Sequence, residues 1–286
     1  MLPLLGCGAS DSTGVSLPPP PPTQLAIDVR YLSELSAQQQ AVVAAAADKW
    51  MHALVIDLGA FQLSSPSGEC FADEPALRET HDNLLLFVSV APIDGQHGVI
   101  AYTQICQQSA RDSLPTVSHI RIDADDIDSI EVKGLLPSIV THEMAHALGF
   151  NPQVYAQKRL VEGSVSDPYF TGSAARTEFG QKIPGYGGNS VPLENLDQLG
   201  TQSSHWRWSV FGDELMISSI LPGYRYPLST ITLGLFRDIG YNVNMSVADP
   251  YPIYSIMAGP TGELRIPLGN DIVAARTSRI VTPVRR

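Results

Sequence analysis

Residues 141-THEMAHALGF-150 contain two histidines four positions apart, with a glutamate directly after the first. If the stretch is a helix, His142 and His146 lie on one face, about 5–6 Å apart at Cβ, and both reach one ion. Their imidazole nitrogens suit zinc. Glu143 lies about 100° around the helix from His142, beside the metal rather than on it. We therefore predict a zinc-binding helix in which Glu143 takes a proton from a metal-activated water.

Gly149 predicts how the chain leaves this helix. Glycine accepts the positive φ of a helix C-terminal cap, which turns the chain back beneath the metal. The alternative, two ordinary histidines and a solvated glutamate on a half-buried helix, leaves Gly149 unexplained. The pattern H-E-x-x-H-x-x-G resembles the start of the metzincin zinc-peptidase motif. Metzincins place their third ligand three residues after the glycine, but that position is Pro152 here, which cannot bind a metal.

The third ligand therefore has to come from elsewhere in the chain. Five further histidines are available: His52, His81, His97, His119 and His205. The first lies in an Ala-rich predicted helix, and the next three lie in or beside predicted strands. Only His205 is downstream, where a chain turned back by Gly149 would arrive.

The segments around this helix predict a mixture of strands and helices. We expect strands at residues 24–29, 83–92, 97–105 and 116–125, and helices at 36–55, near Pro137 to 149, and at 229–243. The helix predictions rest on apolar residues at helical spacing, with Ser229 as a cap for the last one. The strand at 83–92 is a compact apolar run. Residues 151–204 are rich in Gly, Ser, Pro and Asn and predict a long irregular insertion.

Composition limits the class of protein. A chain of 286 residues with 44% hydrophobic content can bury a core in one large domain or two smaller subdomains. Acidic residues exceed basic ones by 29 to 18, and a net charge of −11 argues against binding nucleic acid or an anionic membrane surface. The acidic stretch 123-DADDID-128 does not fit a calcium-binding EF-hand, because Ile127 and Gly134 occupy its fifth and twelfth positions. We interpret it as a strand end that leads towards the helix.

Several separate motifs, in the right order, resemble the leishmanolysin-type metzincins. In that family an insertion separates the second and third zinc histidines, the third histidine lies in a Ser-His-Trp context, and an Asp-Glu-Leu-Met segment follows. The corresponding residues here are 204-SHW-206 and 213-DELM-216, and the resemblance covers roughly residues 83–245. No prodomain with the family's inhibitory cysteine and no cysteine-rich C-terminal domain is recognisable, so we expect a compact relative.

The resemblance implies one Zn²⁺ per chain, bound by His142, His146 and His205. It also implies that Met216 is the Met-turn methionine beneath the metal, although plain core packing would explain a buried methionine equally well. The implied activity is that of a zinc metalloendopeptidase with Glu143 as general base. An extended polypeptide substrate would pair with the strand at 97–105.

The implied fold is α+β, of the metzincin type with two subdomains. We expect residues 1–23 to form a signal-like tail and proline-rich linker. Residues 24–150 would form an N-terminal catalytic subdomain with a twisted mixed sheet, long helices and the active-site helix. Residues 151–286 would form an irregular C-terminal subdomain with the insertion, the third ligand and the Met-turn. Two other functions stay open: a surface-anchored, zinc-stabilised binding or adhesion protein without catalysis, and a metal-dependent hydrolase of non-peptide bonds.

The cysteines predict export. Leu4-Leu5-Gly6-Cys7 resembles a bacterial lipobox, which makes Cys7 a candidate lipid attachment site, and Pro18 to Pro22 would form an extended spacer. The alternative is a disordered tail with a chance cysteine. Cys70 and Cys106 would then form one disulfide, which an exported protein permits; two buried free thiols are the alternative. We therefore expect an extracellular, cell-surface or periplasmic protein.

Overall fold

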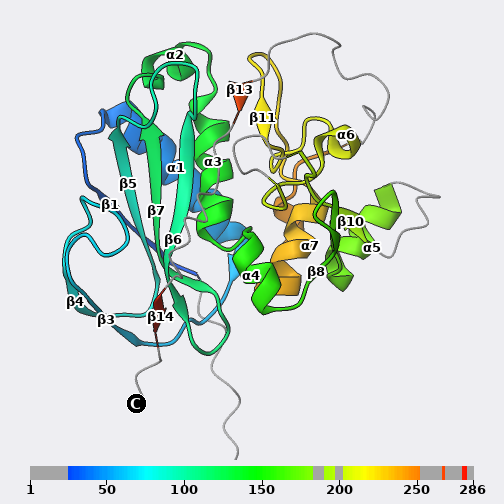
Figure 1. Ribbon diagram of the computed structural model, residues 1–286, viewed down its shortest axis with the longest axis horizontal. Helices are drawn as coiled ribbons and strands as arrows, with labels where there is room; N and C mark the ends of the chain where they lie inside the picture. Colours follow the sequence, from blue (N-terminus) through cyan, green and yellow to red (C-terminus); the bar gives the residue numbers. More distant parts are fainter. Residues whose placement is uncertain (1–24, 183–189, 197–201, 252–265, 268–278, 282–286) are drawn as a thin grey trace, which may run out of the picture.

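The computed structural model describes most of the chain (Figure 1). The described residues are 25–182, 190–196, 202–251, 266–267 and 279–281. The N-terminal segment that contains Cys7 and Pro18 to Pro22 lies outside them. In the described part of the chain, no helix combines the length and the hydrophobicity needed to cross a membrane.

A mixed sheet of five strands forms one side of the molecule, in the order β1-β5-β7-β6-β14 (Figure 1). Its strands are β1 (Ile27–Tyr31), β5 (Leu84–Ala91), β6 (Ala101–Ser109), β7 (Pro115–Asp123) and β14 (Arg279–Val281). β1, β5 and β7 run parallel to one another, β6 is antiparallel to β7, and β14 is parallel to β6. The prediction of a mixed sheet combined with helices is therefore confirmed.

β5 lies inside the sheet, between β1 and β7, because its residues are apolar on both faces. Leu84, Leu85, Leu86, Phe87 and Val88 are each at most 1% exposed. A strand that is buried on both faces shows continuous hydrophobicity rather than alternation. The apolar run that predicted this strand thus reflects its position in the sheet.

Two long helices, α1 (Ala37–Ala53) and α3 (Leu136–Ala147), lie side by side and pack on the sheet (Figure 1). α1 begins at Ser36, which forms a capping box with the first turn. The Trp50 Nε1–H of α1 donates to the Thr141 carbonyl of α3 at 3.0 Å. This bond fixes the active-site helix against its neighbour.

Two helices lie in this part of the chain, where the sequence predicted one that begins near Pro137. α2 (Ile127–Val132) ends shortly before Gly134, which has a φ of +68°. α3 then begins with Pro137 in its first turn. A proline fits there because the first N–H groups of a helix have no helical partner. The predicted start of the active-site helix is therefore confirmed.

β6 begins four residues later than the sequence predicted, at Ala101 instead of His97. Carboxylates organise the preceding turn: Asp94 accepts the Val99 N–H at 2.9 Å, and Asp126 accepts the His97 N–H at 3.1 Å. His97 has a φ of +69°, outside the range of a strand. Backbone N–H groups bound to these carboxylates are not available to a strand ladder, so the predicted start of the strand was wrong.

A disulfide-closed loop covers the sheet on the face opposite α3. The flanking strands are β3 (Phe61–Ser65) and β4 (Leu77–His81). Cys70 of the loop is bonded to Cys106 of β6, with the two Cα atoms 5.5 Å apart. Phe71 stacks on His119 of β7, with ring centroids 3.8 Å apart. The predicted pairing of the two cysteines is therefore confirmed.

Residues 151–204 are more regular than predicted. They contain α4 (Pro152–Gln157), β8 (Val161–Ser164), β9 (Asp167–Phe170), α5 (Ser173–Lys182) and β10 (Val191–Pro192). β8, β9 and β10 form a three-stranded antiparallel sheet. The prediction of an irregular insertion was wrong because these strands hold only two to four residues, too few to show a period. α5 is also hard to recognise, since it buries only Ala175 and Phe179.

α7 (Thr230–Ile239) packs on α5 and begins at the predicted cap, Ser229, whose side chain accepts the Thr232 N–H. The two helices approach so closely that a Cβ at Gly234 would lie 2.8 Å from the Ala175 Cα. Only glycine fits such a contact. The remaining short elements are α6 (Trp208–Phe211), β11 (Ser219–Ile220), η1 (Met245–Val247) and β13 (Ile266–Pro267).

The segments before and after residue 150 are joined at several points. β2 (Leu54–Val55), directly after α1, pairs with β12 (Asn242–Val243), directly after α7. Lys49 Nζ lies 2.7 Å from a carboxylate oxygen of Asp249. The predicted division into two subdomains at residue 150 stays a prediction.

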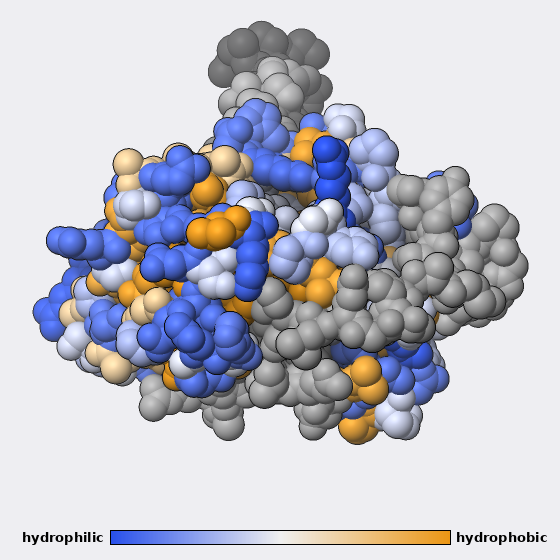
Figure 2. Space-filling view, turned by 90° about the horizontal axis from the view of Figure 1, so that it is seen from above, coloured by the Kyte–Doolittle hydropathy of each residue, from blue (hydrophilic) through white to orange (hydrophobic). Residues whose placement is uncertain are grey.

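The surface seen in Figure 2 is mixed in character: hydrophobic residues of the described chain are scattered between hydrophilic ones. The exposed large hydrophobic side chains among the described residues are Val132, Val165, Leu196 and Tyr224. This face therefore gives no indication of a broad apolar docking surface. The buried polar side chains on α3 are the more distinctive feature.

Candidate metal centre

Three polar side chains of α3 are buried in the interior of the molecule. His142, Glu143 and His146 are each at most 1% exposed. The helix ends just after them at Gly149, which has a φ of +115°. A Cβ at this position would also lie 3.0 Å from Ile239 Cδ1 of α7. The chain thus turns at Gly149 as predicted, with a positive φ that favours glycine, and the nearby Ile239 side chain leaves little room for a larger residue.

His205 reaches the same place from a segment 59 positions after His146. The main chain around it is held on two sides. The Glu194 N–H donates to the His205 carbonyl at 2.8 Å, and the Trp206 N–H donates to the Met216 carbonyl at 2.9 Å. The main chain at His205 is thus held between two other segments, and Ser204 Oγ lies 2.8 Å from the His205 Nδ1.

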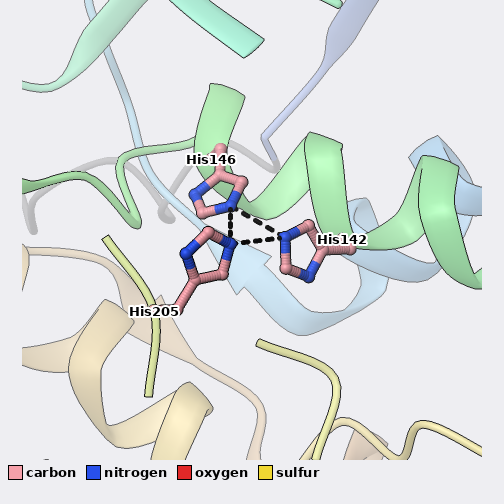
Figure 3. Close-up of side chains that lie close together, drawn as sticks. All are labelled: His142, His146 and His205. Atoms are coloured by element: carbon pink, nitrogen blue, oxygen red, sulfur yellow. Dashed lines mark hydrogen bonds between the residues drawn. The ribbon is translucent and has the colours of Figure 1, made fainter. Parts of the chain in front are cut away.

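The three imidazole rings bring their Nε2 atoms together (Figure 3). These atoms are 2.9 Å apart between His142 and His146, 3.1 Å between His142 and His205, and 3.2 Å between His146 and His205. Tetrahedral zinc with ligands at about 2.0–2.1 Å would separate two nitrogens by roughly 3.3 Å. The three predicted residues therefore lie together, at close to the spacing that a tetrahedral ion needs.

The opposite ring nitrogens determine which Nε2 atoms carry a proton. His142 Nδ1 lies 2.7 Å from the Leu215 carbonyl, and His146 Nδ1 lies 2.6 Å from the Phe150 carbonyl. A carbonyl only accepts, so each Nδ1 is the protonated atom and each neutral ring turns a bare Nε2 to the centre. Two bare nitrogens 2.9 Å apart repel each other, whereas a cation between them would be bound by both. The residues therefore fit a metal ion.

Burial keeps the two helix histidines neutral. It lowers the pKa of His142 from 6.5 to about 4, although the hydrogen bond to Leu215 acts in the opposite direction. Burial also lowers the pKa of His146 well below its ordinary value, and the neighbouring His142 and His205 lower it further. Neutral imidazole is the form that binds a metal.

Glu143 directly follows His142 on α3, but among the described residues the group of ligand atoms within 4.8 Å of one another comprises the three histidines only. Glu143 Oε2 accepts the hydroxyl of Thr103, on β6, at 2.7 Å. Its Oε1 is buried and has no hydrogen-bond partner among the described residues. Burial raises the pKa of Glu143 to about 8, against the opposite effect of the Thr103 hydroxyl. One carboxylate oxygen is thus anchored and the other is left for a further ligand.

Comparison with known proteins identifies the family. The family model for Leishmanolysin, of the M8 peptidases, matches residues 78–252. The chain belongs to the leishmanolysin family of metallopeptidases. The resemblance inferred from the sequence motifs is therefore confirmed, and the family implies a bound metal.

Individual relatives match over about half to two thirds of this chain. Leishmanolysin of Leishmania chagasi is 32% identical over 176 residues, which is 57% of this chain and 28% of that protein. Leishmanolysin of Leishmania major is 31% identical over 197 residues, or 65% and 31%. The human ciliated left-right organizer metallopeptidase is 32% identical over 172 residues, or 53% and 21%. The matched region thus spans less than a third of the length of each of these relatives.

A second buried carboxylate, Glu214, holds the segment that follows the third histidine. It accepts the N–H of Met216, the N–H and Oγ–H of Ser229, and the Oγ1–H of Thr232. Thr232 Oγ1 in turn accepts the Nε1–H of Trp206 at 2.8 Å. Glu214 thus connects the beginning of α7 with both Met216 and the residue next to the third histidine.

The other histidines of the leishmanolysin-family chain are not part of the metal centre: His52, His81, His97 and His119. His52 is exposed on α1, near Asp48. His97 is exposed in the turn before β6. His119 is buried on the disulfide-covered face of the sheet, where its Nε2 lies 2.7 Å from Ser89 Oγ. Of the five candidates for a third ligand, only His205 joins the pair on α3.

Sequence reasoning misses two polar residues around the centre, Thr103 and Glu214. Glu214 belongs to the motif 213-DELM-216, which was used only for its methionine, so the signal was available. Thr103 is a threonine in a strand, where this residue type is common. Its contact with Glu143 depends on how β6 lies against α3, and no local pattern encodes that.

Proposed function

We propose that this chain is a zinc-dependent endopeptidase in which His142, His146 and His205 bind one zinc ion and Glu143 is the general base. The convergence of three Nε2 atoms, two of them bare because their rings donate through Nδ1, carries this proposal. Three histidines leave zinc an open position, as catalytic sites require. Membership in a metallopeptidase family supports peptides as the substrate.

The roles of the protein residues follow from their contacts. When bound, zinc polarises the scissile carbonyl and lowers the pKa of a water molecule towards ~7. Glu143 accepts the proton of the attacking water through its free Oε1 and later donates that proton to the leaving amine nitrogen. Met216, which is fully buried, provides an apolar floor near the third ligand.

The substrate would bind to the edge of the main sheet. Within the described residues, β14 pairs with β6 only at Gln107 to Ser109, which leaves the outer side of Ala101 to Ile105 without a strand partner. An extended peptide can pair there as an added strand. The proposed substrate position is therefore the structured part of the stretch 97–105, on the strand that carries Thr103.

The test compares the wild type with Glu143→Gln, and with Glu162→Gln as a control in an exposed strand, β8. We expect all three proteins to bind one zinc per chain, measured by elemental analysis. In a peptide-library digestion, Glu143→Gln should lose about 10²–10⁴-fold in rate, because general-base catalysis contributes that much.

Each other outcome has a definite meaning. A Glu143→Gln protein that keeps most of its activity would place the base elsewhere. A zinc-loaded wild type that cleaves no peptide would favour the zinc-stabilised adhesion protein. A wild type without zinc would refute the metal assignment.

A further inference from the structure

The contact between Thr103 and Glu143 is the only described hydrogen bond of the Glu143 carboxylate. The Thr103 hydroxyl oxygen lies 2.7 Å from Glu143 Oε2 and 2.9 Å from the Glu143 main-chain oxygen. One hydroxyl carries one proton, and Oε2 is the nearer of the two acceptors. The hydroxyl therefore holds Oε2, while Oε1 stays buried and without a partner among the described residues.

This asymmetry matters because a glutamate side chain has several free torsions. A buried carboxylate whose oxygens both lack partners can rotate between rotamers, and only some of them present an oxygen to the reacting atoms. Fixing one oxygen selects the orientation of the other. Loss of orientation at a catalytic group lowers the rate without changing how the substrate binds.

Thr103 is itself held rigidly. Its side chain is 1% exposed, and its neighbours on the same face of β6, Ala101 and Ile105, are 0% and 6% exposed. A β-branched side chain in a strand has restricted χ1 freedom. Thr103 also lies in the register of the sheet, opposite Ile120 of β7. The hydroxyl is therefore a fixed point against which Glu143 can be aligned.

We infer that Thr103 is a positioning residue for the general base, and that it keeps Glu143 Oε1 directed at the attacking water. The inference rests on the endopeptidase function proposed above. In the reaction, a water O–H bond breaks, its proton goes to Oε1, and the water oxygen bonds to the peptide carbonyl carbon. The C–N bond then breaks and the same proton passes to the amine nitrogen, so that Oε1 is regenerated while Oε2 stays on Thr103.

The arrangement has a consequence for the substrate. Thr103 belongs to the part of β6 whose outer side has no described strand partner. A peptide paired with that edge would be positioned by β6. Glu143 would be positioned by Thr103, which belongs to the same strand. The scissile bond and Oε1 are then placed by the same rigid element, rather than by two elements that move separately.

The experiment compares three substitutions in the full chain. Thr103→Val removes the hydroxyl at nearly constant shape, Thr103→Ser keeps it, and Thr116→Val is the matched control. Thr116 is a buried strand threonine on β7 whose hydroxyl has no partner among the described residues. For each protein, kcat and KM on one peptide, the zinc dissociation constant and the melting temperature are measured.

We expect Thr103→Val to lower kcat by about tenfold or more, in line with the sensitivity of catalysis to misplaced groups. KM and the zinc dissociation constant should stay within about twofold of the wild type. Thr103→Ser should restore kcat to within a few-fold, and Thr116→Val should behave as the wild type. An unchanged kcat in Thr103→Val would overturn the inference, and so would a serine variant as slow as the valine variant.

Failure of this inference is distinguishable from failure of the proposed function. If the wild type cleaves peptides and Glu143→Gln does not, the function holds whatever Thr103→Val does. If Thr103→Val does not fold, as judged by its melting curve, Thr103→Ala is measured with the same expectation. Equal losses of zinc affinity and of kcat would assign Thr103 a structural role and overturn the inference.

Discussion

Each histidine of the candidate metal centre has two ring nitrogens, and for the two on α3 a main-chain carbonyl decides which of them faces the centre. The carbonyls of Leu215 and Phe150 take the Nδ1 protons of His142 and His146. Such contacts orient a ligand ring and raise its basicity. Leu215 directly precedes Met216, so the segment that was predicted as the Met-turn also orients the first ligand.

At the same scale, we expect His205→Ala to lose tight zinc binding. Two ligands would remain on α3, and losing even an outer partner of a ligand weakens zinc sites by about 10–100-fold. The zinc dissociation constant should therefore rise by more than about 100-fold, measured by competition with a chromogenic chelator. His52→Ala, at an exposed histidine on α1, is the control. Wild-type affinity in His205→Ala would show that this ring is not a ligand.

The residues of the site differ in how far the sequence reveals them. Helix geometry alone places His142 and His146 on one face, so the i, i+4 spacing is sufficient. His205 lies 59 positions beyond His146; its downstream position favoured it, and the family resemblance implied it as the ligand. The role of Thr103 could not be predicted, because it depends on the packing of β6 against α3.

At the scale of elements, Glu214 joins α7 to the segment of the third ligand. Its Oε1 accepts three hydrogen bonds and its Oε2 accepts one, so both oxygens act as acceptors of N–H or O–H groups. An amide would face at least one of these donors with its own NH₂ group. We therefore expect Glu214→Gln to lower the free energy of unfolding by about 2–3 kcal/mol.

The same substitution should also weaken zinc binding, because Trp206 is held through Thr232 by this carboxylate. Denaturant titration and chelator competition measure the two effects. Glu162→Gln, on the exposed edge of β8, should change neither quantity. If Glu214→Gln matched the wild type in stability and zinc affinity, the connection between α7 and the third ligand would contribute to neither quantity.

The packing of β7 predicts an acid-sensitive contribution to stability. Burial and, to a smaller extent, the charge of Arg121 lower the pKa of His119 from 6.5 to about 3, against the opposite effect of Asp73. Below pH 6.5 the unfolded chain therefore gains a proton at this residue that the folded protein does not. The free energy of unfolding should fall with pH from about 6.5 towards 3, by at most about 1.4 kcal/mol per pH unit.

The matching experiment is denaturant unfolding of the wild type and His119→Gln at several pH values. The glutamine keeps a polar group near Ser89 and does not titrate. The wild type should lose stability more steeply between pH 6 and 4 than the variant does. Parallel pH dependences would mean that His119 does not contribute to acid unfolding.

Elements with strong local signals are the ones that the sequence predicted well. α1 and α7 have the serine caps and helical spacing that define their beginnings, and the apolar run of β5 marks a buried strand. The beginning of β6 and the elements of 151–204 were predicted incorrectly. There the structure depends on carboxylate–amide contacts and on very short strands, and both depend on tertiary contacts more than on local pattern.

At the scale of the whole molecule, the metal centre joins segments from both sides of residue 150. Two ligands come from α3 and the third from the segment after β10, so a bound ion would link them in addition to the β2–β12 pairing. An ion that binds only the folded chain adds to its stability by mass action. The proposed zinc would therefore support the fold as well as the reaction.

The disulfide bears on where the whole protein acts. The Cys70–Cys106 bond closes a loop with a sequence separation of 36, and such a bond contributes about 3–4 kcal/mol in the chain-entropy model. Disulfides persist in oxidising compartments and are rare in the cytosol. The bond therefore supports the proposal that the protein is exported.

The last prediction is that the protein is exported and carries a lipid on Cys7. Leu4-Leu5-Gly6-Cys7 has the form of a lipobox, and Pro18 to Pro22 would serve as an extended tether between the membrane and the folded chain. With Cys7 modified, the remaining two cysteines are those of the disulfide. Mass spectrometry of the mature N-terminus from native cells should find a lipidated Cys7 as the first residue, and Cys7→Ser should release the protein from the membrane fraction. An unmodified Cys7 within an intact peptide that starts at Met1 would refute the anchor and leave the disulfide as the remaining support for export.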